Sequence, residues 1–360
     1  MNKLTKDNRL DNLYSEIANV IRSARSNVKR AIDLEQVKAY WLIGYSIVEE
    51  EQAGADRAEY GKKLLKNLSD RLTKEFGKGF SARTLLDVRK FYLVYQESVD
   101  DSISHAPRAK SQVPQFRDNL GWTHYRSLMR ITRPEERKFY EVEASKNNWS
   151  SRELDRQLGS LLFDRLAKSK DKKGLMDLVI NGQEIATPED VFKEPLVLEF
   201  LNMPESPKLL ESDLEEALIS NLQNFLLELG RGFAFVARQK RLTLDGKHFF
   251  CDLVFYHTIL KCYVLVDIKV DELTHGDLGQ MQLYKNYYDA HCLHSGDNPT
   301  IGLILCTEKS DVVVEYFLGD KEKNIFAKKY QLYLPSKAEL EAEIKKEVEE
   351  LKSKFEYEKE

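Results

Sequence analysis

Two aspartates and a lysine on neighbouring apolar segments are the residues of this sequence best suited to chemistry. Asp252 lies within Phe249–Tyr256, while Asp267 and Lys269 lie at the end of a second run that begins at Cys262. Both runs are rich in β-branched and aromatic residues, which is typical of strands, and their apolar character indicates burial on both faces. Because burying unpaired charge is costly, the pattern favours a bivalent cation at a hydrolytic site.

The spacing of the two runs predicts how the strands pair. A hairpin centred between Ile259 and Leu260 would give cross-strand partners whose residue numbers sum to 519. Asp252 then lies opposite Asp267, and directly opposed residues share a face with Cβ atoms about 5 Å apart. Lys269 is two residues beyond Asp267, so we expect its side chain on the same face.

Magnesium suits a site of this kind, because it prefers carboxylate oxygens, keeps several waters and accepts phosphate oxygens as further ligands. Manganese is the alternative cation. The metal would polarise a phosphodiester and help to generate hydroxide, while the lysine would hold the attacking water or neutralise charge in the transition state. An Asp-x-Lys pattern is also common on solvated strand faces, and the apolar neighbours are what favour the buried site here.

Several blocks that occur in order resemble the PD-(D/E)xK nuclease superfamily, and most of all its YhcG-type members. The blocks are Leu214–Ile219, Phe225–Gly230, Gly232–Gln239, Asp252–His257 and Asp267–Lys269. The resemblance covers nearly the whole chain and implies an α+β protein of two domains. The N-terminal domain would be all-α and helix-turn-helix-like, and the C-terminal domain would be α/β and restriction-endonuclease-like with an αβββαβ core.

The resemblance also implies a role for each acid and for the lysine. Asp252 and Asp267 become metal ligands, and Lys269 becomes the catalytic lysine. Glu215 becomes a further metal ligand or a water-mediated contact. Glu216 competes with Glu215 for that role, and both lie near a helix N-terminus, where acids are stabilising anyway.

Gln280 and Tyr284 resemble the Gln-x-x-x-Tyr motif of RecB-like nucleases, and their spacing places both on one helix face. The alternative interpretation is a helix cap at Gln280 and a core position for Tyr284. The sequence departs from the superfamily pattern at Cys251, where others carry Pro, and at Asp267, where many carry Glu. The side chain of Asp267 is shorter than that of Glu, which would alter the geometry of a bound metal.

The composition is that of a globular protein long enough for two cores. The chain has 360 residues, of which 42% are hydrophobic and 32% charged. It contains no apolar run of 18 residues, which excludes a predicted membrane span, and Met1–Asp7 lacks the apolar core of a secretory signal. The four cysteines fall in no CxxC or zinc spacing, so we expect buried free thiols and a cytoplasmic protein. They are Cys251, Cys262, Cys292 and Cys306.

The net charge of -4 hides an asymmetry between the two halves of the chain. Residues 1–170 carry 32 Lys and Arg against 24 Asp and Glu, net +8, whereas residues 171–360 carry 23 against 35, net -12. A basic half suits phosphate contacts, so we expect the N-terminal part to supply much of the affinity for nucleic acid. The alternative is a solvated surface with ordinary charge scatter.

Apolar periodicity in the N-terminal part predicts helices at residues 10–32, 35–52, 60–75 and 81–95. The last two flank a turn at 76–80, and Ser81 is expected to cap the second of them. This helix–turn–helix outline is a candidate DNA reader that would use Arg83, Arg89 and Lys90. Its packing face would comprise Leu85, Leu86, Val88 and Phe91. The alternative is an oligomerisation or partner-binding bundle.

The predicted domain plan is a basic helical domain at 1–170, a linker at 171–210, a nuclease domain at 211–335 and a charged helix at 336–360. Residues 98–118 are typical of a polar loop, and Lys168–Gly174 is the expected domain boundary. Within the nuclease domain the patterns predict a helix at 212–229, with Gly230 as an αL cap, and a second helix at 278–290. They also predict strands at 233–244, 249–256, 262–269 and 301–306, and an edge strand at 330–334. Arg238 and Lys240 on the first strand are candidate nucleic-acid contacts.

Together these features predict a Mg²⁺-dependent deoxyribonuclease, with an endonuclease as the expected type. One alternative is a non-catalytic DNA-binding or assembly protein that retains a nuclease fold. Another is an RNA nuclease, because a metal site acts on phosphates common to both nucleic acids. A homodimer is a further expectation, since paired cuts need two sites and residues 338–355 would form a helix with one narrow apolar seam.

Overall fold

The computed structural model describes residues 4–53, 57–96, 113–167, 172–193, 195–204, 209–319 and 322–334. The chain divides into two compact units, residues 1–155 and 156–360, which are described separately below. The predicted domain ranges, with their boundary near 170, stay a prediction. The charged tract at 168–171, most of the predicted polar loop and the helix predicted at 338–355 lie outside the described residues.

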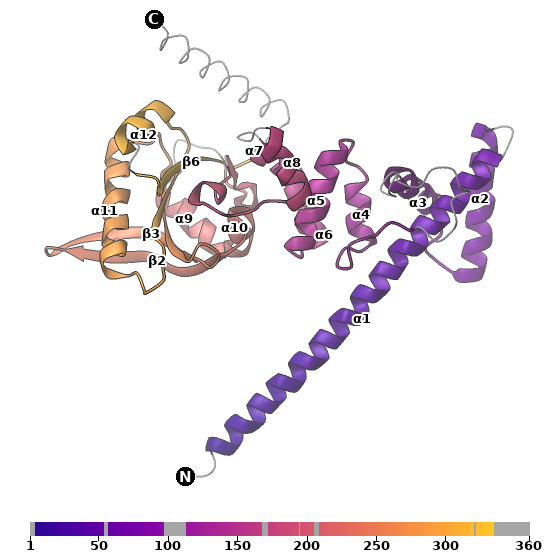
Figure 1. The fold of residues 1–360 in the computed structure, drawn as a ribbon, viewed down its shortest axis with the longest axis horizontal. Coiled ribbons are helices and arrows are strands. Elements are labelled where there is room, and N and C mark those ends of the chain that lie inside the picture. Colours follow the sequence, from indigo (N-terminus) through magenta and orange to yellow (C-terminus); the bar gives the residue numbers. More distant parts are fainter. Residues whose placement is uncertain are drawn as a thin grey trace, which may run out of the picture. The chain divides into compact units, whose positions relative to one another are not determined.

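The first unit is helical, as predicted (Figure 1). Its helices are α1 Leu4–Ala53, α2 Arg57–Phe76, α3 Ala82–Tyr95, α4 Trp122–Leu128 and α5 Pro134–Lys146, and α6 Ser151–Gly159 spans the division between the units. The prediction of two separate helices at 10–32 and 35–52 was wrong, because α1 runs through both. Only Asp33 and Leu34 separate the two predicted helices, and neither is a Pro or Gly that would break the backbone pattern.

Helix α3 is the centre of this unit. Ser81 caps it as predicted, with its side chain accepting from the backbone N–H of Thr84. The buried face of α3 comprises Leu85, Val88, Phe91, Tyr92 and Tyr95, whereas Leu86, predicted to pack, is 48% exposed. Gly44 lets α1 approach α3 closely, since a Cβ there would collide with the carbonyl oxygen of Val88.

The second unit is a mixed six-stranded sheet with helices on both faces. Its helices are α7 Leu162–Ala167, α8 Lys172–Asn181, α9 Glu211–Ser220, α10 Leu222–Leu229, α11 His275–His291 and α12 Asp311–Leu318, with 3₁₀ turns at Pro188–Asp190 and Glu199–Leu201. Its strands are β1 Leu196–Val197, β2 Phe233–Leu244, β3 Lys247–His257, β4 Cys262–Ile268, β5 Ile301–Cys306 and β6 Ile325–Gln331. The order across the sheet is β1-β6-β5-β4-β3-β2. The predicted αβββαβ order is therefore present.

Alternation along the central strands builds two cores, one on each face of the sheet. Leu253 and Val266 face Leu214 and Phe225 of α9 and α10. Val254 and Leu265 face Leu278, Met281 and Tyr284 of α11. Because β4 contributes to both cores, its apolar run reads as continuous rather than alternating.

Three details of the second unit differ from the prediction. The helix expected at 212–229 is interrupted at Asn221, whose side chain bonds the carbonyl of Ala217 in competition with the helix backbone. Gly230 ends α10 at φ 110 and ψ -158, so it is not an αL cap. The strand expected at the edge near Tyr330 is β6, which lies between β5 and the unpredicted edge strand β1.

A buried ion network ties the start of this unit to α10. Glu228 is fully buried and binds Arg165 at 2.6 Å and Arg156 at 3.1 Å. Burial would raise the pKa of Glu228, but the charges of Arg165, Lys193 and Arg156 outweigh it and lower the pKa to about 2. The carboxylate is therefore charged across the physiological range.

The cysteines are free thiols, as predicted, and Cys251, Cys262 and Cys306 are buried. Across the described residues no helix combines the length and apolar character needed to cross a membrane.

Candidate active site

The hairpin of β3 and β4 has the predicted register. Leu253 pairs with Val266 and His257 with Cys262, so partner numbers sum to 519. The next step of this register places Asp252 beside Asp267, at the point where β4 leaves its pairing with β3. Both acids thus lie where β4 ends, with Asp252 in the middle of β3 and Asp267 one residue before the last residue of β4.

Asp252 is fixed by the backbone of the neighbouring strand. Its Oδ2 atom accepts a hydrogen bond from the N–H of Ile268 at 2.9 Å, and its Oδ1 atom accepts one from the amide of Gln239 at 3.0 Å. Burial nevertheless raises the pKa of Asp252, and the charge of Glu215 adds to the rise. The site therefore resists carrying this many negative charges without a cation.

Asp267 is the most buried acid of the site, with 2% of its surface exposed. Lys269 lies directly after β4 and places its Nζ atom 3.1 Å from Oδ2 of Asp267 and 3.3 Å from Oε2 of Glu211. Burial, and then the charge of Asp252, raise the pKa of Asp267 to about 7 against the opposing charge of Lys269. Burial would lower the pKa of Lys269, but the two carboxylates outweigh it and hold the pKa above its usual value.

Glu215 reaches the same region from α9. It is 5% exposed, whereas its competitor Glu216 is exposed. Its Oε1 atom binds Nε of Arg238 at 2.6 Å, and its Oε2 atom accepts from the amide of Gln239 at 2.5 Å. The structure thus brings Glu215 and Asp252 together through one shared amide.

Gln239 is a site residue to which the sequence analysis gave no role. Its amide nitrogen bridges Glu215 and Asp252, and its backbone φ of 45° is unusual for a non-glycine residue. Strained backbone of this kind is often held at functional sites. The available signal was its place in the block Gly232–Gln239, but nothing in that block predicts the positive φ or the bridge.

Gln280 and Tyr284 form a pair on α11 beside the acids. The amide of Gln280 donates to the Tyr284 hydroxyl at 2.7 Å, and this hydroxyl donates to the carbonyl of Phe250 at 2.8 Å. Thr274 caps α11, so Gln280 is not the cap, and Tyr284 is a core residue at 2% exposure. Burial and the charge of Asp267 raise the pKa of Tyr284 to about 12. Among the described residues, neither Gln280 nor Tyr284 forms a hydrogen bond with the acids.

The predicted nucleic-acid contacts fall into two groups in different units. On α3, the side chain of Arg83 is 84% exposed and its Nε atom lies 3.7 Å from Oδ1 of Asp87. Lys90 is exposed as well, whereas Arg89 forms an ion pair with Glu51 at 2.5 Å. On β2, Lys240 is exposed, while Arg238 is engaged by Glu215. Arg83, Lys90 and Lys240 are therefore more accessible to a phosphate than Arg89 and Arg238.

The donor set fits a hard cation, although no group of three or more His, Cys, Asp and Glu side chains converges as a metal cluster in the described part of the chain. Oδ2 of Asp267 is buried and accepts no well-oriented hydrogen bond from another described residue, despite the nearby ammonium of Lys269. A buried carboxylate oxygen that lies beside a second carboxylate is a natural ligand for Mg²⁺ or Mn²⁺.

Comparison with known proteins finds relatives for both parts of the chain. Residues 189–348 match the family described as the YhcG PDDEXK nuclease domain, and residues 16–165 match the DUF1016 N-terminal domain. The chain is 35% identical over 349 residues to "Putative nuclease YhcG" of Escherichia coli (strain K12), and the alignment covers 92% of each chain. A repair endonuclease from Pyrococcus abyssi is similar over 37% of this chain and 50% of its own, with 12% identity and a TM-score of 0.24.

Proposed function

The chain belongs to the YhcG family of PDDEXK nucleases, and from that premise we propose that it is a metal-dependent enzyme that hydrolyses phosphodiester bonds in DNA. Nucleases of this superfamily typically use a divalent metal. The observation that carries the proposal is that Asp252, half-buried in the middle of β3, and Asp267, buried at the end of β4, lie on neighbouring strands, with Lys269 beside Asp267. Neighbouring acids whose pKa values are raised by burial and by each other are typical of functional sites.

Asp252 and Asp267 would hold the cation, with Glu215 as a third carboxylate. We favour Glu215 over Glu216 because Glu215 is buried and shares the Gln239 amide with Asp252. When bound, a divalent cation polarises the phosphodiester and lowers the pKa of water. It would also neutralise the acids whose pKa values burial raises, which keeps both Asp252 and Asp267 ionised.

Lys269 is the side chain best placed to act on the reacting groups. Its ammonium is held at 3.1 Å from Asp267 and its pKa is raised, so it stays charged and donates hydrogen bonds only. A fixed ammonium would position a water molecule or stabilise the developing charge on phosphate. Gln280 would help to orient the site through its hydrogen bond to Tyr284, whose hydroxyl bonds the backbone of β3 at Phe250.

The N-terminal unit would recruit nucleic acid through its basic surface. Residues 1–170 carry a net charge of +8 against -12 for the remainder. Phosphate binding is driven by Lys and Arg through release of counterions. The acidic C-terminal part of the chain would therefore bind nucleic acid weakly without the basic N-terminal part. The exposed Arg83 and Lys90 of α3 are the candidates.

The proposal is tested by incubating the purified chain with labelled single-stranded, duplex and branched DNA and with RNA of matched sequence, each with Mg²⁺, Mn²⁺ or EDTA. We expect cleavage of DNA that requires metal. Cleavage of RNA but not of DNA would show that the chain is an RNA nuclease. Binding of DNA without cleavage under every condition would favour the alternative of a non-catalytic protein that retains the fold.

A further inference from the structure

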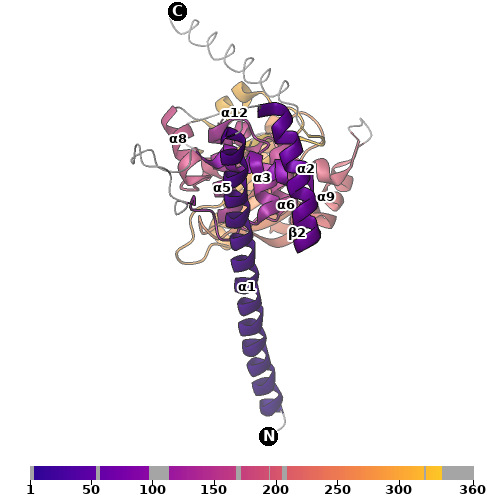
Figure 2. The ribbon, with the colours of Figure 1, turned by 90° about the vertical axis from the view of Figure 1, so that its right-hand side faces the viewer.

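The N-terminal half of α1 carries an apolar stripe that no other described element covers. Figures 1 and 2 show this half of the helix extending past α2 and α3, the helices of its own unit. The stripe consists of Leu13, Ile17, Val20, Ile21, Val28 and Ile32, and these side chains are 47% to 64% exposed. A contiguous apolar face of this length on one helix marks an interaction surface. An isolated helix in water is itself marginal without packing.

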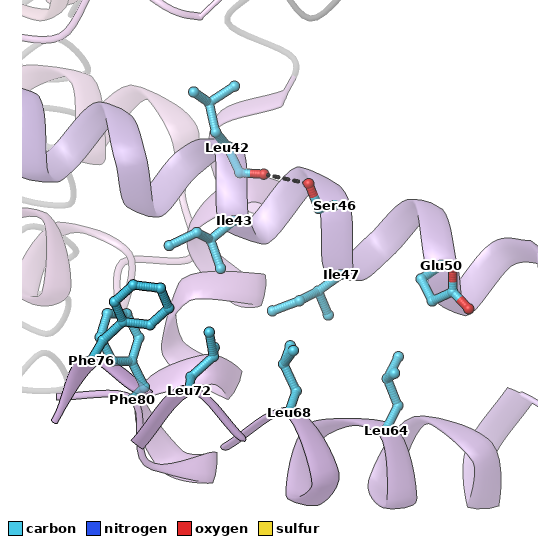
Figure 3. A pocket seen from close by; sticks show the side chains of 10 residues that line it. All are labelled: Leu42, Ile43, Ser46, Ile47, Glu50, Leu64, Leu68, Leu72, Phe76 and Phe80. Carbon is cyan, nitrogen blue, oxygen red and sulfur yellow. Dashed lines mark hydrogen bonds between the residues drawn. The ribbon is translucent and has the colours of Figure 1, made fainter. Parts of the chain in front are cut away.

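A complementary hollow lies further along the same unit. Between the C-terminal half of α1 and α2 there is a groove of about 610 Å³ with an almost wholly apolar lining (Figure 3). Its walls include Ile43, Ile47, Leu64, Leu68, Leu72 and Phe76. Figure 3 shows Ile43 and Ile47 of α1 pointing toward the leucines of α2, which point back toward α1. The groove has the shape and chemistry to take one face of a further helix.

The stripe and the groove are continuous along α1. Val28 and Ser46 are 18 residues apart, and so are Ile32 and Glu50; at 3.6 residues per turn this separation is about five turns. Each pair therefore points to the same side of the helix. A second helix that lay in the groove beside Ser46 and Glu50 would run directly onto the stripe.

The charges along α1 indicate the direction of that second helix. Residues 12–32 carry four basic side chains and one acid, net +3, whereas residues 33–52 carry one basic side chain and five acids, net -4. A parallel pair of α1 helices would place like charges together. An antiparallel pair places the basic half of each beside the acidic half of the other, which lowers the electrostatic energy.

We propose that two copies of this chain associate through antiparallel α1 helices. The N-terminal end of the stripe of each copy, at Leu13 and Ile17, is seated in the groove of the other copy, and Val28 of each copy faces Ile32 of the other. The contact is isologous, because the same two surfaces meet twice about a two-fold axis. A pairing that brings Tyr14 of one copy beside Ser46 of the other is centred on residue 30, since 14 and 46 average to 30. This surface does not involve the helix predicted at 338–355, and the inference does not depend on the proposed nuclease activity.

The association is measured by sedimentation of the full chain over a range of concentrations. We expect a species of twice the 41.8 kDa of one chain that dissociates in the variant Ile17→Glu/Ile21→Glu. The matched control Asn19→Glu/Ser26→Glu adds the same charge on the opposite, exposed side of α1 and should remain a dimer. Leu68→Glu in the groove should also produce a monomer. A monomeric wild type, or a dimer unaffected by both Ile17→Glu/Ile21→Glu and Leu68→Glu, overturns the proposal.

Cross-linking tests the direction in a Cys292→Ser background, which removes the cysteine that is not buried. Within one chain, residues 14 and 46 are 32 positions apart on a single helix, or about 48 Å, too far for a short bismaleimide. We expect dimer cross-links from Tyr14→Cys/Ser46→Cys and few from Tyr14→Cys alone. Efficient cross-linking of Tyr14→Cys alone would show a parallel pair and contradict the proposal.

Discussion

At the scale of single residues, the site is defined by how little water reaches Asp267. Its carboxylate is 2% exposed, one oxygen accepts no well-oriented hydrogen bond within the described residues, and its nearest opposite charge is Lys269 at 3.1 Å. The sequence predicted that Asp252, Asp267 and Lys269 would converge, because strand period and hairpin spacing determine that outcome. It did not predict Gln239, because a positive φ inside a strand depends on the surrounding packing.

Asp267→Asn should change the pH dependence of stability in metal-free protein. The pKa of Asp267 is about 7 when folded and about 3.9 when unfolded, so the folded state binds the proton more tightly. The contribution of Asp267 to the free energy of unfolding is therefore fully present below the unfolded pKa, and it is lost as the pH rises to about 7. The variant should therefore unfold at a higher temperature than wild type at pH 8 in EDTA, with little difference near pH 4. An equal shift at both pH values would contradict the raised pKa.

Gln239→Ala should slow cleavage without abolishing it. The amide of Gln239 holds Glu215 at 2.5 Å and Asp252 at 3.0 Å, and loss of a residue that orients metal ligands typically costs about 10–100-fold. The readout is the concentration of Mg²⁺ that gives half-maximal cleavage, which should rise. Gln282→Ala is the matched control, because Gln282 bonds Asn286 on α11 away from the acids. An unchanged Mg²⁺ requirement would remove Gln239 from the site.

At the scale of elements, the strands were more predictable than the helix ends. Strands β2 and β5 match their predicted residues, because turn residues bound both runs, with Gly232 before β2, Gly246 after it and Pro299 before β5. The breaks were not predictable in the same way. Asn221 interrupts a good helical pattern, and α1 continues through the position where an end was expected. Strand β1 has two residues and only its pairing with β6 identifies it.

Glu228→Gln should destabilise the second unit by about 3 kcal/mol, because it leaves the buried Arg165 without its charge partner. The measurement is the urea dependence of thiol labelling, since Cys251, Cys262 and Cys306 are buried in that unit and react when it opens. Glu216→Gln, on the exposed side of α9, is the control and should leave the labelling midpoint unchanged. A similar midpoint for both variants would show that the ion network contributes little.

At the scale of the whole molecule, affinity and chemistry are assigned to different parts of the chain. The basic surface belongs to the N-terminal half of the sequence, while the acids that would hold metal belong to the C-terminal half. Charge and composition indicate this division, but only the fold shows that Arg238 is engaged by Glu215 while Arg83 and Lys90 remain exposed.

Arg83→Ala/Lys90→Ala should weaken DNA binding at low salt and leave the rate of cleavage of bound DNA unchanged. Removing two phosphate contacts should reduce the slope of log affinity against log salt concentration by about 2. Lys66→Ala/Arg71→Ala on α2 is the matched control for loss of two exposed positive charges. If the control weakens binding as much, α3 has no special part in recruiting DNA.

The central claim is that Asp267 and Lys269 perform metal-dependent hydrolysis. The most direct measurement compares single-turnover DNA cleavage by wild type, Asp267→Asn and Lys269→Ala at saturating protein with Mg²⁺, while binding of the same DNA is measured in EDTA. We predict that both variants bind DNA as wild type does and cleave it at least 100-fold more slowly, as expected when a group that stabilises the transition state is removed. Cleavage at the wild-type rate by either purified variant would contradict the assignment.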